Sequence, residues 1–403
     1  MMNRELLLKA AKEYGGSFYL FDREQFINNY NSFKNAVAKY YPNFNIAYSY
    51  KTNYIPPICK IVNGFGGYAE VVSDMEMDIA LKCGVPYHRI IWNGPIKRIN
   101  RVVKAACKGT TINIDNLLEL KALATAIEGT NVQINVGVRT NFDVNDNVVS
   151  RFGFDVESRD FDEALNIIKS NKQFKLNCLH CHFAKRSIEF WPERMKGIVN
   201  IVDRVEAKYG LVPSIVDLGG GIYGNMDEVL KKQFTDHIPS YQEYAEVIGP
   251  QIAKSFKNKN IEVVCEPGTA LAADVVKFVG QVASIKEVRG KYFATLLASQ
   301  KNINISGKNP PIEIIHNSDS VRDYADMDFV GYTCIEGDVL YKDYSGKLGI
   351  GDYVIFSNCG SYSIVMKPPF ILPNVPILEF KDSQVVVIKR AETFEDLFKT
   401  YNF

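Results

Sequence analysis

From about residue 25 to about residue 275, short apolar runs alternate with stretches in which apolar residues recur at helical spacing. Eight of the runs read as strands: 45–50, 67–72, 90–92, 111–114, 133–137, 175–182, 215–218 and 261–266. Five stretches between them read as amphipathic helices: 74–82, 116–126, 161–170, 192–209 and 241–257. This alternation predicts a parallel sheet, and eight strands within about 250 residues favour a closed (β/α)8 TIM barrel over an open sheet.

The pattern changes after about residue 280. Four later runs read as strands without long helical stretches between them: 278–289, 292–297, 352–356 and 384–389. Turn signals such as Arg289-Gly290 and Gly351-Asp352 separate these runs. The C-terminal part of the chain is therefore predicted to form a second, all-β domain.

Composition and charge narrow the class of protein. The 403 residues are long for one domain, and 46% hydrophobic with 23% charged residues is the balance of a soluble globular protein. A net charge of +1 gives no basic field for nucleic acid. No run approaches the roughly 20 apolar residues of a membrane span, and residues 1–6 lack the apolar core of a signal peptide. We expect a cytoplasmic protein with neither nucleic acid nor membrane as a partner.

The eight cysteines are scattered along the chain, and without a secretory signal we expect them to be thiols. Cys178, His180, Cys181 and His182 have the ligand types of a zinc site. They lie in a single predicted strand with no second cluster downstream, whereas structural zinc usually takes two such pairs. We therefore expect no metal site.

Lys51 closes the strand-like run 44–50 and is followed by the small polar residues Thr52 and Asn53. A lysine in that place lies at the carboxyl end of a buried strand, where α/β folds carry their chemistry. Partial desolvation lowers the pKa of an ammonium group, and the free amine can form a Schiff base with an aldehyde. The alternative is an ordinary solvated surface lysine.

Gly219, Gly220 and Gly221 follow the short predicted strand 215–218. Three consecutive glycines let backbone N–H groups approach an anion without obstruction by Cβ atoms, and a phosphate is the natural guest. The loops after the late strands of a barrel are a common phosphate site. A flexible turn is the alternative; a dinucleotide loop is disfavoured, because the spacing is not Gly-x-Gly-x-x-Gly.

Glu266 stands at the end of the last predicted barrel strand, just before Pro267 and Gly268. A carboxylate there can hold a cationic ring nitrogen in its protonated form, or it can simply cap the turn. His180 and His182 alternate with Cys181 and so point to the same side of their strand. One of them is placed to stack on a flat cofactor; the alternative is a core histidine.

A Schiff-base lysine, a phosphate loop, a ring-nitrogen carboxylate and a stacking histidine are together the requirements of pyridoxal 5′-phosphate. With this set of residues the chain resembles the fold type III PLP-dependent decarboxylases. These include diaminopimelate and ornithine decarboxylases, with alanine racemase as a more distant relative. The resemblance covers nearly the whole chain in order. It rests on these segments: 16–22, 48–51, 68–76, 179–183, 219–221, 266–268, 334–338, 351–353 and 360–362.

The resemblance implies a division of the chain into domains. Residues 25–280 correspond to an alanine racemase-like, PLP-binding (β/α)8 barrel. Residues 1–24 and 281–403 correspond to a β-rich decarboxylase C-terminal domain, which the N-terminal strand can join.

The resemblance also implies roles for individual residues. Lys51 would carry the Schiff base, Glu70 would assist its proton transfers and His182 would stack on the ring. Glu266 would pair with the pyridinium nitrogen. The remaining cofactor-binding positions would be Gly219, Gly220, Gly221, Gly268 and Tyr362.

The family completes each site across a head-to-tail homodimer, so some residues of this chain would serve the partner's site. Cys334 would be the acid that protonates the carbanion after CO2 leaves. The implied substrate-binding residues are Cys334, Glu336, Asp338 and Tyr362, and the implied partner is a small-molecule amino-acid substrate.

The sequence departs from the family pattern at positions linked to anions and substrate. Relatives carry a Gly-Ser element after the histidine, where this chain has Lys185, Arg186 and Ser187 in an uncertain register. Relatives usually have arginine after Glu-Pro-Gly, often in contact with phosphate or a substrate carboxylate, where this chain has Thr269. In diaminopimelate decarboxylases an acid directly follows the motif cysteine, where this chain has Ile335.

These departures favour a specialised decarboxylase acting on an amino acid or amino-acid conjugate in siderophore, polyamine or antibiotic-type biosynthesis. The alternatives are a diaminopimelate decarboxylase of lysine biosynthesis, and a racemase or epimerase on the same scaffold. A racemase could use Tyr332, Tyr341 or Tyr344 as a base, but it would place arginine where Glu266 stands. A third alternative is a non-catalytic homologue, against which the presence of Lys51 and Cys334 argues.

Overall fold

The computed structural model describes residues 4–304 and 308–403, so the first three residues of the segment 1–24 lie outside the described part. The chain divides into two compact units. One consists of Ile27–Tyr223 and Asp236–Ala270, and the other of Met1–Phe26, Gly224–Thr235 and Leu271–Phe403. Our proposed domain boundaries, at residues 25 and 280, differ from this division in assigning residues 25–26, 224–235 and 271–280 to the barrel.

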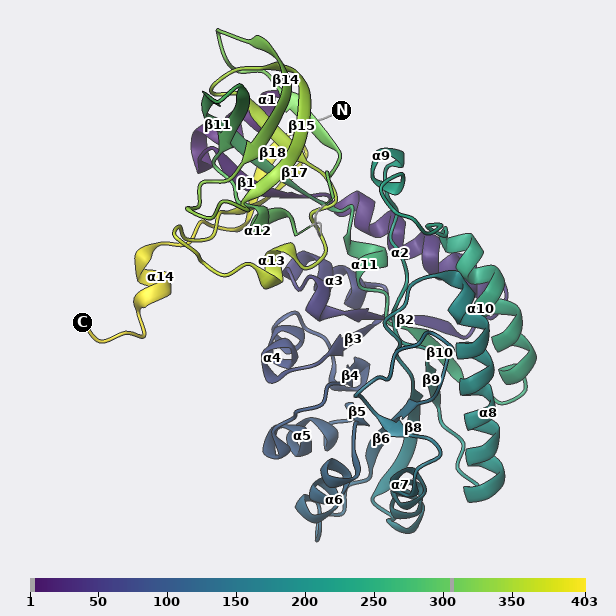
Figure 1. Ribbon diagram of the computed structural model, residues 1–403. Helices are drawn as coiled ribbons and strands as arrows, with labels where there is room; N and C mark the ends of the chain where they lie inside the picture. The colour runs from purple at the N-terminus through teal and green to yellow at the C-terminus, as the bar shows by residue number, and fades with distance from the viewer. Residues whose placement is uncertain (1–3, 305–307) are drawn as a thin grey trace. The chain divides into compact units, whose positions relative to one another are not determined.

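The first unit is built on a closed barrel of parallel strands (Figure 1). Its eight strands are β2 (Phe44–Ser49), β3 (Tyr68–Val71), β4 (Ile90–Trp92), β5 (Thr111–Ile114), β6 (Ile134–Asn141), β8 (Phe174–His180), β9 (Ile215–Asp217) and β10 (Glu262–Cys265). Each pairs in parallel with the next, and β10 pairs with β2 to close the ring. The short strand β7 (Phe154–Asp155) adds to β6. The predicted (β/α)8 barrel and all eight predicted strands are confirmed.

A helix follows each barrel strand, as the alternating pattern requires, and the helices surround the strands (Figure 1). They are α2 (Arg23–Ala38), α3 (Pro56–Gly64), α4 (Asp74–Lys82), α5 (Ile99–Ala106), α6 (Leu117–Ala126), α7 (Arg159–Ser170), α8 (Trp191–Tyr209), α10 (Tyr241–Phe256) and α11 (Thr269–Ala272). Short 3-10 turns are η1 (Tyr50–Thr52), η2 (Tyr87–Arg89) and η3 (Ile188–Phe190). The five predicted helices are confirmed; α2, α3, α5 and α11 were not predicted.

Local sequence explains the limits of these helices. The Ser73 hydroxyl accepts the backbone N–H of Glu76 and begins α4, and Ser240 forms a reciprocal capping box with Glu243 at the start of α10. Gly210 ends α8 in the left-handed conformation, with φ of 69°. The caps fix where each helix starts and so fix the length of the loop that precedes it.

The barrel strands are buried on both faces, which is why they read as continuous apolar runs. One buried cluster of the barrel joins side chains from six strands: Ala47, Tyr68, Ile91, Cys178, Ile215 and Val264. The strands run in one direction, so their carboxyl ends meet at the same rim of the barrel. The predicted strand 175–182 ends at His180, and His182 therefore lies in the loop beyond it.

The second unit contains a mixed sheet whose strands β15, β14, β12, β11, β1, β17 and β18 lie in that order, with β16 paired to β11 and β13 paired to β16. Their bounds are β1 (Ser17–Phe21), β11 (Val276–Val288), β12 (Lys291–Leu296), β13 (Ile312–Ile315), β14 (Arg322–Val330), β15 (Val339–Leu348), β16 (Tyr353–Phe356), β17 (Ile377–Lys381) and β18 (Gln384–Lys389). The N-terminal strand β1 lies between β11 and β17, so it does join this sheet.

Short helices accompany the sheet: α1 (Arg4–Tyr14), α9 (Glu228–Lys231), α12 (Gln300–Ile303), α13 (Ser363–Met366) and α14 (Phe394–Phe398). Helix α1 packs its apolar face on the sheet, where Leu7, Ala10, Phe18, Val279 and Ile355 share one buried cluster. Among the described residues, no helix combines the length and the apolar character needed to cross a bilayer.

Candidate active site

Polar side chains from several barrel strands gather at the carboxyl rim. Strand register places Ser49 opposite Glu70 on β2 and β3, and His180 opposite Asp217 on β8 and β9. Lys51 lies in η1, two residues after the end of β2, and Glu266 directly follows β10; the two strands are neighbours in the ring. Residues far apart in sequence therefore meet because the barrel closes.

Lys51 lies beside the buried carboxylate of Glu70. Its Nζ donates to Glu70 Oε2 at 2.6 Å, and the lysine side chain is one-third exposed. The Ser49 hydroxyl donates to the same carboxylate oxygen at 2.5 Å. The pairing holds the amine at the rim with a proton acceptor in contact, which is what reversible proton transfer at Lys51 requires.

Asn93, directly after β4, joins the two acids of the site. Its amide Nδ2 donates to Glu70 Oε1 at 3.0 Å and also to Glu266 Oε1. Its Oδ1 accepts from Asn113 Nδ2 at 2.7 Å, which fixes the orientation of the amide. Our sequence analysis missed Asn93; the signal that could have found it is a polar residue directly after a buried strand.

Glu266 lies at the centre of the polar group, 3% exposed. His180 Nε2 and His182 Nδ1 each lie 3.4 Å from one of its oxygens. The Gly220 N–H donates to His182 Nδ1 at 3.1 Å, so that nitrogen is an acceptor and the ring is neutral. Burial likewise lowers the pKa of His182. Both histidines thus face the same acid, although His182 does so from the loop after β8 and not from the strand that we predicted.

Glu266 and Asp217 form a buried pair in which only one acid is ionised. Burial opposes ionisation of Glu266, but His180 and then Lys51 overcome it and hold the pKa of Glu266 well below its usual range. For Asp217, burial and then the negative charge of Glu266 raise the pKa well above its usual range. Glu266 is therefore the carboxylate and Asp217 the neutral acid.

The three glycines of the loop after β9 pack directly against the strand β8 side of the rim. A Cβ on Gly219 would lie 2.3 Å from the Cys181 carbonyl oxygen, and one on Gly221 would lie 2.8 Å from that of Phe183. Both glycines also have positive φ, 69° and 82°. No other residue fits there without moving the backbone, so the loop is a closely fitted backbone surface.

Arg194, from α8, holds this loop from beneath and was not predicted from the sequence. Its side chain is fully buried, its guanidinium stacks on Trp191 at 4.0 Å, and it donates to the Gly220 carbonyl at 2.6 Å. It also donates to the Phe183 carbonyl at 3.3 Å. Arg194 therefore ties the glycine loop to the loop after β8.

A cavity of about 230 Å3 opens at the rim. It is lined by Lys51, Glu70, Val72, Asn93, Gly94, Pro95, Arg139, Phe152, His180, His182 and Glu266. His180, His182 and Glu266 have the donor types of a metal site, with ligand atoms within 4.8 Å of one another. The Lys51 amine, the Glu266 carboxylate and the glycine backbone are groups that would fit an aldehyde cofactor with a cationic ring and an anionic end.

Another observation supports that fit. Among the residues that the structure describes, His180 Nδ1 and Asp217 Oδ2 are buried polar atoms without a hydrogen-bond partner. Buried polar atoms are rarely left so, and at a rim lined with glycines they are consistent with a polar guest. Gly268 extends this surface, since a Cβ there would lie 2.0 Å from Thr52 Oγ1, next to Lys51.

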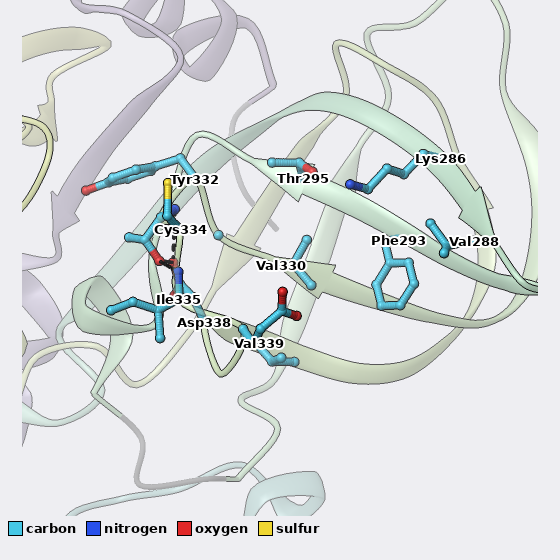
Figure 2. A pocket seen from close by; sticks show the side chains of 13 residues that line it. Lys286, Val288, Phe293, Thr295, Val330, Tyr332, Cys334, Ile335, Asp338 and Val339 are labelled. Atoms are coloured by element: carbon cyan, nitrogen blue, oxygen red, sulfur yellow. Dashed lines mark hydrogen bonds between the residues drawn. The ribbon is translucent and has the colours of Figure 1, made fainter.

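The remaining predicted site residues belong to the sheet unit. Cys334 and Glu336 are exposed and line a second cavity of about 720 Å3 (Figure 2). Asp338 is buried and accepts from Thr333 Oγ1 at 2.6 Å and from the Gln300 N–H at 2.6 Å. It therefore shapes the loop that carries Cys334. Tyr362, at φ 60°, begins α13.

Glu76 makes the stability of the barrel depend on pH. It is 4% exposed, and burial followed by the charge of Glu70 raises its pKa to about 7 from an ordinary 4.5. The folded form holds the proton more tightly, so this stabilisation is complete below pH 4.5 and is lost as pH rises through 7. We expect unfolding free energy to fall by up to about 3 kcal/mol between pH 5 and pH 8.5.

Chemical denaturation at these two pH values checks the expectation. Glu76→Gln keeps an acceptor for the Val72 N–H, which now donates to Glu76 at 2.7 Å, and should remove most of the pH dependence. Glu128→Gln, at an exposed position, is the control and should retain it. If the unfolding free energy of Glu76→Gln changed with pH as much as that of the wild type, Glu76 would not be the source of the pH dependence.

Comparisons with known proteins give a consistent family. The pyridoxal-binding domain of the pyridoxal-dependent decarboxylases matches residues 23–273, and the C-terminal sheet domain of the same family matches residues 197–360. A probable chloroplastic diaminopimelate decarboxylase from Oryza sativa subsp. japonica is 26% identical, covering 96% of this chain and 79% of its own length. A diaminopimelate decarboxylase from Methanocaldococcus jannaschii is 24% identical, covering 97% and 92%.

Solved structures agree on the fold. A crystal structure of the diaminopimelate decarboxylase from M. jannaschii superposes with a TM-score of 0.87 at 23% identity, covering 98% of this chain and 94% of that one. The Helicobacter pylori diaminopimelate decarboxylase complexed with L-lysine gives 0.82 at 21% identity, covering 97% and 98%. The likeness extends over both units of the chain.

Proposed function

Because the chain belongs to the pyridoxal-dependent decarboxylase family, we propose that this PLP-dependent carboxy-lyase acts on diaminopimelate and releases lysine and CO2. The observation that carries the chemistry is the polar group at the barrel rim, where Lys51, Glu70 and Glu266 meet. The substrate is proposed from the relatives, which carry the name diaminopimelate decarboxylase and match 96–97% of this chain.

Diaminopimelate decarboxylase was an alternative in our sequence analysis, whose main interpretation was a specialised decarboxylase. The departures at Thr269 and Ile335 favoured a specialised decarboxylase, and no relative described above supports that. Sequence positions that differ from a family pattern can be compensated elsewhere in the site, so they are weak evidence for a new substrate.

Bound pyridoxal 5′-phosphate supplies an electron sink for the pair of electrons left on the α-carbon when its carboxylate departs. Lys51 Nζ is the amine that would hold the cofactor covalently. Glu70, 2.6 Å away, takes and returns the proton that Lys51 must lose and regain. Glu266 stays ionised and so favours a proton on the ring nitrogen.

Other residues position these groups. His182 offers a neutral ring, held by the Gly220 N–H, for stacking on the cofactor. The backbone of Gly219, Gly220 and Gly221 faces the anionic end, and Gly268 keeps that surface open beside Thr52. Asn93 bridges Glu70 and Glu266 by donating to both carboxylates and so fixes their relative position.

The proposal includes a homodimer in which the sheet unit serves the partner's barrel. Its support is the exposed Cys334 in a cavity of about 720 Å3, together with Glu336 on the lining. Cys334 would return a proton to the α-carbon. The other residues that this unit would supply for substrate binding are Glu336, Asp338 and Tyr362. A cytoplasmic location is also proposed, and all eight cysteines being free thiols fits it.

The experiment is a CO2-release assay on the purified full chain with added PLP. The panel contains meso-diaminopimelate, L-lysine, L-ornithine, L-arginine and a D-amino acid. Chiral chromatography monitors any inversion of the α-carbon of each amino acid. Release from diaminopimelate alone is the expected result. Release from another amino acid would reject the proposed substrate, and inversion without CO2 would reject decarboxylation.

A further inference from the structure

Arg186 lies in the loop between β8 and η3 and points its charged end toward two other loops of the rim. Its Nη2 donates to Thr269 Oγ1 at 3.4 Å, and its guanidinium carbon lies 5.7 Å from the centre of the Tyr223 ring. Thr269 follows Gly268 directly, and Tyr223 comes just after the glycine loop. The guanidinium therefore lies between the two glycine-lined segments of the site.

A hydrogen bond from a buried side chain holds the backbone of Arg186 in place, so the position of this residue is set by the fold. The buried Tyr244 donates its hydroxyl to the Arg186 carbonyl at 2.5 Å and accepts the Tyr223 N–H at 3.2 Å. One tyrosine thus ties the loop after β8 to the loop after β9. A substitution of the Arg186 side chain leaves both of these hydrogen bonds in place.

The other cations near the rim are already engaged. Arg194 is occupied by backbone carbonyls beneath the glycine loop, and Lys51 is paired with Glu70. Arg139 lies 4.0 Å from Asp115 and over Phe152. Lys185 is exposed and lies 6.0 Å from the centre of the Phe190 ring.

Arg186 differs from these cations. Across residues 4–304 and 308–403, its side chain contacts a hydroxyl and an aromatic ring but pairs with no carboxylate. A half-buried guanidinium beside two glycine segments, without a carboxylate of its own, is a site for an anion with several oxygens.

We propose that Arg186 binds the phosphate of the cofactor. In this chain the cation comes from the loop after β8, while position 269, after Glu-Pro-Gly, carries only a hydroxyl. Among Lys185, Arg186 and Ser187, which the sequence leaves open, the geometry selects Arg186. The inference rests on the same cofactor as the proposed function but not on the choice of substrate.

The test measures dissociation constants of the full-length apoprotein for PLP and for pyridoxal, which lacks the phosphate, from the absorbance of the Lys51-bound form. Arg186→Ala should weaken PLP binding about 10–100-fold, since a hydrogen bond to a charged group contributes about 1.5–3 kcal/mol, and should leave pyridoxal binding unchanged. Lys185→Ala, next to it in sequence, should bind PLP as the wild type does.

Moving the positive charge from position 186 to position 269 should restore PLP affinity. Adding Thr269→Arg to Arg186→Ala returns a guanidinium to the place that Arg186 reaches from the other side, and PLP affinity should recover by at least about tenfold. This recovery also separates loss of a contact from misfolding, because a misfolded protein would not regain affinity.

Three results would overturn the inference. Equal weakening of PLP and pyridoxal would indicate damage to the site as a whole. Unchanged PLP affinity with a raised KM for diaminopimelate would assign Arg186 to a substrate carboxylate. Weakening by Lys185→Ala of the same size would assign the phosphate to that lysine. A wild-type protein that binds neither compound would instead reject the proposed function itself.

Discussion

Replacing Lys51 with alanine is expected to abolish CO2 release, with a loss of at least about 10^4-fold in kcat/KM. Lys51 is the amine at the cavity, and its Nζ lies 2.6 Å from Glu70. Without it the cofactor has no covalent attachment, and the substrate amine has no activated carbon to attack. The measurement is steady-state CO2 release together with the absorbance spectrum of the purified protein.

The matched control is Lys104→Ala, which removes an exposed lysine of α5 and should leave activity and spectrum unchanged. Borohydride reduction followed by peptide mass spectrometry should place the cofactor on the peptide that contains Lys51. Retention of more than a few per cent of wild-type activity by Lys51→Ala, or attachment to another lysine, would contradict the assignment.

The same variant tests the proposed homodimer. Lys51→Ala and Cys334→Ala chains are each expected to be nearly inactive, but a mixture refolded together should regain about a quarter of wild-type activity. Half of the dimers would then be hybrids, and each hybrid would have one site with both residues intact. A mixture as inactive as its components would indicate that Cys334 does not act across a shared interface.

Glu266→Gln is expected to lower kcat by about 10^2–10^3-fold while PLP still attaches to Lys51. The physical reason is charge: Glu266 is the ionised member of a buried acid pair, and His180 and Lys51 stabilise that ionisation. An amide of the same shape cannot hold a proton on the ring nitrogen. Single-turnover CO2 release, with the spectrum recorded in parallel, separates this loss from loss of cofactor.

Asp217→Asn is the control that this structure offers for Glu266→Gln. Asp217 is the neutral member of the pair, since burial and the charge of Glu266 raise its pKa. Asparagine resembles a protonated aspartate and can still accept the Gly219 N–H, which donates to Asp217 at 2.9 Å. Its effect on kcat should therefore be at least about tenfold smaller. Equal losses in the two variants would contradict the division of charge.

The sequence by itself determined the barrel and several of its key residues. Strands buried on both faces must be apolar throughout, and helices between them must be amphipathic, so the alternation is visible along the chain. The same pattern identified Lys51, Glu266 and the three glycines as candidates. They lie just after predicted strands, where chemistry is expected in a barrel. The register that brings Ser49 opposite Glu70 could not be read, since nothing local sets it.

Only the tertiary structure decided how the site is connected and charged. Asn93 matters because closure of the barrel places it between Glu70 and Glu266, which come from other strands. Arg194 and Arg186 look alike in the sequence. In the structure Arg194 donates to buried carbonyls, whereas Arg186 contacts Thr269 and Tyr223 and has no carboxylate partner among the described residues. Which of Asp217 and Glu266 carries the charge depends on the histidines around them. Burial, pairing and pKa are properties of surroundings assembled from distant segments, so they follow from the fold and not from any one stretch of sequence.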